Sequence, residues 1–251
     1  MTDLLVPSRF CGPPSSGNGG WTAGALAGLT GIDPAAGVSV SLRKPPPLDT
    51  PMPVATTGAV TAAALGEEVV ARAEPVSPGD PAPPLAEPVS PAEARAAEAS
   101  YAGLTFHPFP TCFACGVGRA AGDGLRIFPG RVADQDGVAR VAATWTPDPS
   151  VGTSTGTSAG AERHATLPVT WAALDCVGGW AGDLEERLMV LARMTAWVDA
   201  VPRIGEEHVV VGLARRVEGR KTFTASTLYD ADGRVTARAE HLWVAVDPAS
   251  L

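Results

Sequence analysis

Residues 168–182, PVTWAALDCVGGWAG, carry a single carboxylate, Asp175, among apolar and small side chains. The proline that opens the stretch is tolerated in a first helical turn, and a helix that is apolar all round is a buried helix. Asp175 shares one face of this helix with Trp171, Leu174 and three glycines. Burial raises the pKa of a carboxylate, which suits a general base. Two structural roles remain open, because Asp175 could cap a shorter helix starting at Cys176 or pair with a buried arginine.

A second candidate group lies near the amino terminus. Asn18 stands at the N-cap position of an alanine-rich helix, with Gly19 and Gly20 as its first residues. The first amides of a helix have no acceptor within it and lie at its positive end. They could polarise a carbonyl group and hold the oxyanion that forms. An ordinary capped helix start explains the same pattern.

Two further sets of residues could contact a substrate. His164 lies in a small polar loop, residues 150–166, that we expect to be mobile, and it could shuttle a proton or be a solvated loop residue. A local basic cluster in the second half could bind phosphate groups, or form a solvated hairpin tip. Its members are Arg215, Arg216, Arg220 and Lys221.

Cys112 and Cys115 form one Cys-x-x-Cys motif. A structural zinc site needs four ligands, and only His107 and His241 could complete this one. A redox role needs the motif at a helix start in a thioredoxin-like unit, which the surrounding sequence does not provide. We therefore predict two small buried residues in a turn and no metal.

Composition excludes several classes of protein. The chain has 251 residues and a formal net charge of -8, without a basic stripe, so we expect no nucleic-acid partner. It has no run of eighteen apolar residues and its first residues do not resemble a signal peptide, so we expect no membrane association. Four scattered cysteines do not make a secreted disulfide scaffold. These observations predict a cytoplasmic protein.

The remaining pattern indicates helices followed by antiparallel strands. A strand at 38–48 precedes two or three more at 52–76 that turn near Gly66. A proline-rich linker at 74–91 leads to a helix that Pro91 opens. In the second half we expect strands at 125–128, 138–145, 187–198 and 209–215, and then a hairpin turning at Asp232 and Gly233.

Two short sequence matches suggest an internal duplication. VVARAEPV at 69–76 matches VTARAEHL at 235–242, and GGW at 19–21 matches GGW at 178–180. Both pairs occur in the same order and at similar offsets, although alanine-rich sequences also match by chance. We predict an N-terminal half at 1–76, a linker with a short helix at 77–100 and a C-terminal half at 101–251.

Three motifs resemble those of one family. The segment CFACG…GDGLRIF at 112–128 is similar to the opening of small acyl-CoA thioesterases of the hotdog class. WAALDCVGGWA resembles their Leu-Asp helix, in which the aspartate is catalytic, and GNGGW at 17–21 resembles the Gly-Gly turn that opens a hotdog helix. The resemblance implies an α+β double hotdog, in which two tandem helix-wrapped antiparallel sheets form a pseudo-dimer.

The same resemblance implies hydrolysis of an acyl-CoA or acyl-carrier thioester, with Asp175 as general base or nucleophile. Coenzyme A would enter only as part of the substrate, its phosphates meeting the basic cluster, and no other cofactor is expected. The chain could also assemble as a homo-oligomer. Because no His-Gly-Gly precedes the helix, a non-catalytic module that binds an acyl thioester or apolar ligand is an alternative. A hydratase or dehydratase acting on an acyl thioester is a weaker one.

Overall fold

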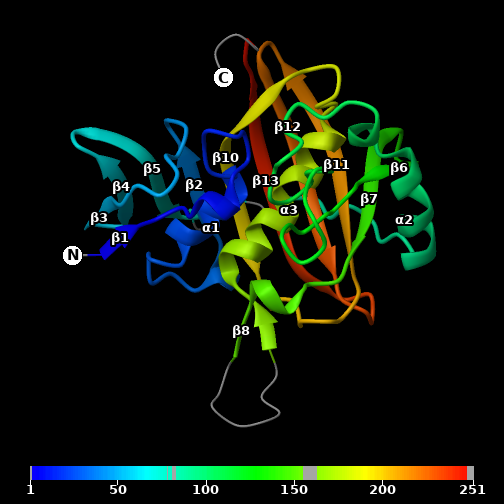
Figure 1. Ribbon diagram of the computed structural model, residues 1–251, viewed down its shortest axis with the longest axis horizontal. Helices are drawn as coiled ribbons and strands as arrows, with labels where there is room; N and C mark the ends of the chain where they lie inside the picture. The colour runs from blue at the N-terminus through cyan, green and yellow to red at the C-terminus, as the bar shows by residue number, and fades with distance from the viewer. Residues whose placement is uncertain (1, 78, 81–82, 155–162, 248–251) are drawn as a thin grey trace.

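The computed structural model describes residues 2–77, 79–80, 83–154 and 163–247 (Figure 1). These residues form three α-helices, α1 (Gly19–Ala27), α2 (Pro91–Ala97) and α3 (Leu167–Ala181). The strands before α2 are β1 (Thr2–Leu4), β2 (Val38–Leu42), β3 (Met52–Thr57), β4 (Val60–Leu65) and β5 (Glu68–Pro75). The later strands are β6 (Gly130–Gln135), β7 (Val138–Trp145), β8 (Gly152–Ser154), β9 (Arg163–Ala165), β10 (Met189–Val198), β11 (His208–Glu218), β12 (Lys221–Tyr229) and β13 (Val235–Ala245).

One antiparallel sheet of 11 strands, in the order β1-β3-β4-β5-β2-β10-β13-β12-β11-β7-β6, runs through the described residues. In each half a helix leads into one strand, β2 or β10, and a three-strand meander follows. The last strand of each meander, β5 or β13, pairs with the strand after the helix. The two halves therefore have the same topology, which supports the predicted duplication.

The halves meet where β2 pairs with β10, and the register there reveals a local two-fold relation. Glu74 and Glu240, which the sequence repeat aligns, pair with Ser39 and Thr195 respectively. Ser39 and Thr195 are therefore equivalent, and they also pair with each other, with their hydroxyl oxygens 3.0 Å apart. Because equivalent residues face each other, the pseudo-dyad passes through this pair. The arrangement is that of a double hotdog, as the sequence predicts.

Helices α1 and α3 pack against each other on one face of the sheet (Figure 1). The contact is close because α1 presents glycines to α3. A Cβ on Gly20 would lie 2.4 Å from Asp175 Cβ, and one on Gly24 would lie 2.8 Å from Trp171 Cβ. The later glycine on α1, Gly24, meets the earlier residue on α3, Trp171, so the two helices run antiparallel. Glycine is needed at both positions for this approach rather than for backbone freedom.

The opposite face of the second half is covered by the segment that leads from the linker into α2. Val209 and Val211 of β11 pack with Ala86 and Ala94 on this outer face, whereas Val210 packs on the inner face. The Ala86 amide donates to the Thr227 hydroxyl at 3.1 Å. The proline-rich segment is therefore a cover for the sheet as well as a connection, and β11 is apolar on both faces for that reason.

Most predicted elements are confirmed, including α1 with its Asn18 cap, α3, β7, β10 and the hairpin whose turn contains Gly233 at φ 76°. The predicted strand at 125–128 is wrong. Arg126 has a φ of 54°, which interrupts an extended chain, and the segment bonds instead to the Cys-x-x-Cys loop through Leu125 and Ile127. The predicted polar loop is shorter than expected, because β8 and β9 form a hairpin from its ends, and 155–162 lies outside the described residues. The boundaries at 76 and 100 stay predictions.

Candidate functional site

Asp175 lies at the middle of α3, on the face that meets the start of α1. Its side chain is buried, with 2% of its surface exposed. Oδ2 accepts the Gly20 amide at 2.8 Å and the Asn18 amide nitrogen at 3.2 Å. Oδ1 is buried and has no hydrogen-bond partner in the described part of the chain. The helix is continuous through Asp175 and no arginine bonds to it there, so both alternative structural roles are wrong.

Burial raises the pKa of Asp175 to about 7, from an ordinary value of 3.8. The Gly20 amide opposes this rise, a charged Cys112 adds to it, and the Asn18 side chain opposes it. Desolvation is the largest of these effects because a buried charge loses its hydration and only two donors replace it. The carboxylate can therefore exchange a proton near neutral pH, as a general base must.

A cavity of about 430 Å³ extends from Asp175 between the two halves. Its apolar wall includes Leu42, Met189, Leu191 and Trp243, whereas Asp175, Asn18, Gly19 and the Cys-x-x-Cys loop form its polar end. A mostly apolar cavity with a few convergent polar groups is typical of a small-molecule site. The cavity can therefore hold an apolar group along its wall and a polar group at the Asp175 end.

Each residue at the start of α1 makes a different contact at the site. Asn18 caps the helix by accepting the Trp21 amide at 2.8 Å, and its NH₂ group points to Asp175. The Gly20 amide is taken by the same carboxylate. Gly19, at the first helical position, lines the cavity, and an amide at that position has no acceptor within its helix. The structure thus brings Asn18, Gly19, Gly20 and Asp175 together.

His164 lies elsewhere. It is on β9, opposite Thr153 of β8, and is not one of the residues that line the Asp175 cavity. Helix α3 separates them along the chain, since Asp175 is about 12 Å beyond the start of α3 at a rise of about 1.5 Å per residue. In the described part of the chain, neither carboxylate oxygen of Asp175 bonds to His164.

The predicted basic cluster also lies away from Asp175. Arg215 and Arg216 line a different cavity of about 530 Å³, together with Trp180, and Arg220 donates to the Ala245 carbonyl. None of the four cations lines the Asp175 cavity, as far as the described residues show. Two cations that sequence reasoning missed do line it. They are Arg43 and Lys44, which follow β2 and are exposed. Their position directly after a strand and before three prolines was the available signal.

A third feature that the sequence did not reveal is a group of three thiols at the polar end. The sulfurs of Cys112, Cys115 and Cys176 all lie within 4.8 Å of one another, and all three residues line the cavity. Cys112 Sγ and Cys176 Sγ are 3.7 Å apart. The Cys-x-x-Cys pair is visible in the sequence, but its third member is 61 positions further along and reaches it only through the packing of α3.

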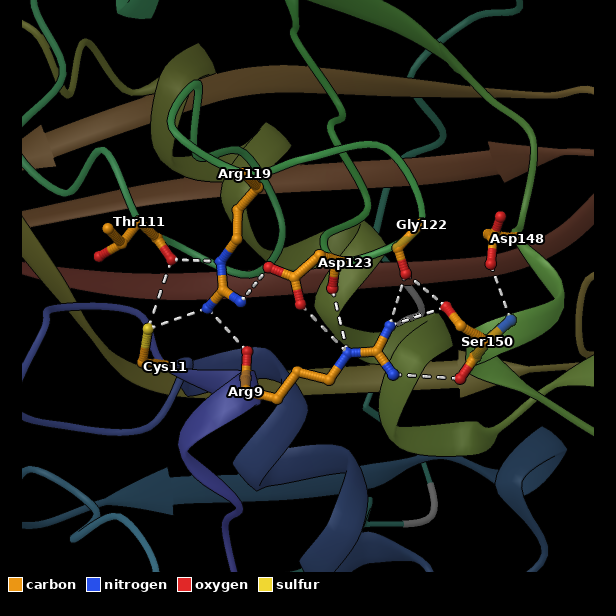
Figure 2. A network of polar contacts seen from close by, with 8 residues as sticks. All are labelled: Arg9, Cys11, Thr111, Arg119, Gly122, Asp123, Asp148 and Ser150. Carbon is orange, nitrogen blue, oxygen red and sulfur yellow. Dashed lines mark hydrogen bonds and ion pairs between the residues drawn. The ribbon is translucent and has the colours of Figure 1, made fainter.

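Two arginines hold the Cys-x-x-Cys loop against the amino-terminal segment (Figure 2). Arg119 donates to the carbonyls of Thr111 and Arg9, each at 2.7 Å, and pairs with Asp123 at 2.9 Å. Arg9 donates to the Gly122 carbonyl at 2.8 Å and to the Ser150 hydroxyl at 2.7 Å. We call this set of contacts the arginine clamp. It fixes one wall of the cavity, since the clamped segment continues into Asn18 and the clamped loop carries two of the thiols.

Comparison with solved structures defines the class of protein by its fold. A conserved protein of unknown function with a hot dog fold from Alicyclobacillus acidocaldarius is 14% identical, with a TM-score of 0.60, over 97% of this chain and 92% of that one. A thioesterase II from Thermobifida fusca, described as putative, is 15% identical, with a TM-score of 0.55, over 97% of this chain and 91% of that one. A tesB protein from Mycobacterium avium subs paratuberculosis is 12% identical, with a TM-score of 0.54, over 97% of this chain and 91% of that one. The chain is a double hotdog protein.

At these identities the likeness concerns the fold alone. No family model matches the sequence, and no curated protein matches it. Among the described helices, none combines the length and the hydropathy needed to cross a bilayer. The cytoplasmic location and the homo-oligomer stay predictions.

Proposed function

We propose that this protein hydrolyses an acyl thioester, with Asp175 as the residue that activates water. The observation that carries the proposal is the asymmetry of the Asp175 carboxylate. Oδ2 is held by two donors, whereas Oδ1 is left without a partner in the described part of the chain, beside a largely apolar cavity. Such a carboxylate is fixed in position and still has an oxygen that can accept a proton.

In the proposed reaction, a water molecule bound at Oδ1 attacks the thioester carbonyl carbon while Oδ1 takes its proton. The Gly19 amide donates to the carbonyl oxygen as it becomes an oxyanion. Collapse of the tetrahedral intermediate breaks the carbon–sulfur bond, and Asp175 returns the proton to the departing thiolate. The products are a carboxylic acid and a free thiol.

Direct attack by Asp175 is the other form of the same reaction. It would give a mixed anhydride that water then hydrolyses. Label found in Asp175 after a single turnover in ¹⁸O-labelled water identifies Asp175 as the nucleophile. If Asp175 is a general base, the acid product of the first turnover carries the label. If Asp175 is the nucleophile and water attacks the Asp175 carbonyl of the anhydride, the label enters the carboxylate of Asp175 and the first product is unlabelled. Attack at the acyl carbonyl labels the product in either mechanism, so label in Asp175 is the diagnostic result.

The chemistry of the rim supports a thioester with an anionic carrier. Arg43 and Lys44 are exposed and lie at the Asp175 cavity, so phosphates of coenzyme A or of a carrier protein could pair with them while the acyl group enters. Arg215 and Arg216 line the other cavity. Replacement of Arg43 and Lys44 by alanine should therefore raise KM more than replacement of Arg215 and Arg216.

The test is hydrolysis of a panel of acyl-CoA substrates, measured by the release of the free thiol. We expect Asp175→Asn to lower kcat by about 10² to 10⁴-fold, the range for loss of a positioned acid–base group. Asp183→Asn is a matched control, because Asp183 is exposed at the end of α3 and its φ of 70° suits asparagine equally well. Equal rates for Asp175→Asn and the native protein would remove Asp175 from the mechanism. Binding of acyl-CoA without hydrolysis by the native protein would favour the non-catalytic module.

A further inference from the structure

The three thiols at the polar end of the cavity have no role in the proposed hydrolysis. Cys112, Cys115 and Cys176 are all buried and free. The fourth cysteine, Cys11, is also buried, but its sulfur lies in the arginine clamp, where it accepts from Arg119 at 3.1 Å. Three of the sulfurs therefore lie close together, and the sulfur of Cys11 is not part of that group.

We propose that Cys112, Cys115 and Cys176 form a binding site for a zinc-type divalent metal ion, with its fourth coordination position open to the Asp175 cavity. The proposal concerns the three thiols rather than the Asp175 carboxylate, and it does not depend on the proposed hydrolysis. It also replaces the sequence prediction that the Cys-x-x-Cys motif is only a turn.

The distance between the sulfurs fits a tetrahedral ion. Zinc–sulfur bonds are about 2.3 Å long, so two thiolates on one tetrahedral ion lie about 3.8 Å apart. Cys112 Sγ and Cys176 Sγ are 3.7 Å apart, and no sulfur of the three is more than 4.8 Å from another. A disulfide needs about 2.05 Å, which would require a larger movement of groups in a packed core.

The backbone of the loop is shaped to bring two sulfurs together. The Gly116 amide donates to the Cys112 carbonyl at 2.9 Å and closes the turn. A Cβ on Gly116 would lie 2.5 Å from the same carbonyl oxygen, so the turn needs glycine there. The loop is fixed on both sides, because the Phe113 amide donates to the Cys11 carbonyl and the Ile127 amide donates to the Ala114 carbonyl. The third sulfur then comes from α3.

Donors around the sulfurs stabilise the thiolate form that a metal ion requires. The Asn18 NH₂ group lies 3.7 Å from both Cys112 Sγ and Cys176 Sγ.

The fourth ligand has to come from the cavity. His107 also lines it, but Nδ1 accepts the Phe109 amide at 2.9 Å and Nε2 lies 3.1 Å from the Cys115 carbonyl, so both ring nitrogens are engaged. Water or a thiol from the cavity would complete the coordination. Sites with three protein ligands and one exchangeable position are common for zinc that contacts substrate.

Cobalt(II) is the probe for this site. The protein is first treated with a chelator under reducing conditions and desalted, and Co²⁺ is then added without oxygen. We expect one ion per chain, a near-ultraviolet thiolate-to-cobalt band, visible bands of a four-coordinate ion, and loss of these bands when Zn²⁺ displaces Co²⁺. Because zinc binds thiolates, Zn²⁺ should release protons in weak buffer near neutral pH.

Cys176→Ser and Cys115→Ser should lose the bands, whereas Cys11→Ser should keep them. Folding is checked by the unfolding midpoint, which Zn²⁺ should raise in the native protein and in Cys11→Ser but not in Cys176→Ser. The proposal is overturned if the reduced native protein gives no thiolate band, if Cys176→Ser binds Co²⁺ as the native protein does, or if only copper(I) binds. None of these measurements depends on thioester hydrolysis, so the metal-site proposal can hold even if the protein hydrolyses no acyl-CoA.

Discussion

Replacing Gly20 by alanine tests the central geometry, because that glycine lets α1 touch the face of α3 that carries Asp175. The added Cβ would lie 2.4 Å from Asp175 Cβ and 2.7 Å from the Trp171 carbonyl oxygen. Carbon atoms in contact are normally about 3.5–4.0 Å apart, so the helices would have to separate by about 1 Å. This movement would also weaken the bond from the Gly20 amide to Asp175, which is 2.8 Å long.

The expected loss of stability combines three effects. Overpacking of a core costs about 1–3 kcal/mol. Weakening a hydrogen bond to a charged group costs about 1.5–3 kcal/mol when the bond is lost completely. Alanine gains about 1 kcal/mol over glycine in a helix interior, and less at a second helical residue. We therefore expect the free energy of unfolding to fall by about 2–4 kcal/mol, together with a loss in kcat of about 10²-fold because Asp175 moves.

Gly28→Ala is the matched control on the same helix. Gly28 is exposed, has helical dihedral angles, and an added Cβ would have no neighbour closer than 3.6 Å. That exchange should stabilise the fold by about 0.4–1 kcal/mol. Urea unfolding of both variants measures the difference, and hydrolysis of the best acyl-CoA substrate measures the effect on the site. If Gly20→Ala is as stable as Gly28→Ala, the close approach of the two helices at this position is refuted.

Three other predictions follow from the site. In metal-free protein, the contribution of protonated Asp175 to folded-state stability is complete below pH 3.8 and is lost as the pH rises through the folded-state pKa of about 7. Asp175→Asn should therefore become progressively more stable than the native protein over this range, by up to about 4 kcal/mol at pH 8. A constant difference in urea unfolding between pH 4 and 8 would contradict this. Arg119→Ala should lower the unfolding free energy by about 2–3 kcal/mol because the clamp loses two short carbonyl contacts, whereas the exposed Arg234→Ala should change it by less than about 1 kcal/mol. The rise in KM on replacing Arg43 and Lys44 by alanine should shrink as salt is added, because ions screen exposed charges, and an effect independent of salt would rule out phosphate pairing.

The sequence was sufficient for most of the elements and for the chemical character of Asp175, although not for the segment at 125–128. A single carboxylate in an apolar helix could be recognised because burial follows from composition, and the cap at Asn18 follows from local backbone chemistry. The repeated motif around Glu74 and Glu240 predicted a duplicated fold, which the pairing of β5 with β2 and of β13 with β10 bears out. These are local properties, or patterns that two copies share.

Tertiary packing alone decided which residues meet. The Gly20 amide reaches Asp175 across 155 positions because α1 and α3 pack without side chains between them, and Cys176 joins the Cys-x-x-Cys loop in the same way. The cations at the cavity are Arg43 and Lys44 rather than the longer basic cluster, since strand order places the end of β2 beside β10. Sequence determines what each segment can do, but distances between segments far apart in the chain depend on how their surfaces fit, and no local pattern encodes that fit.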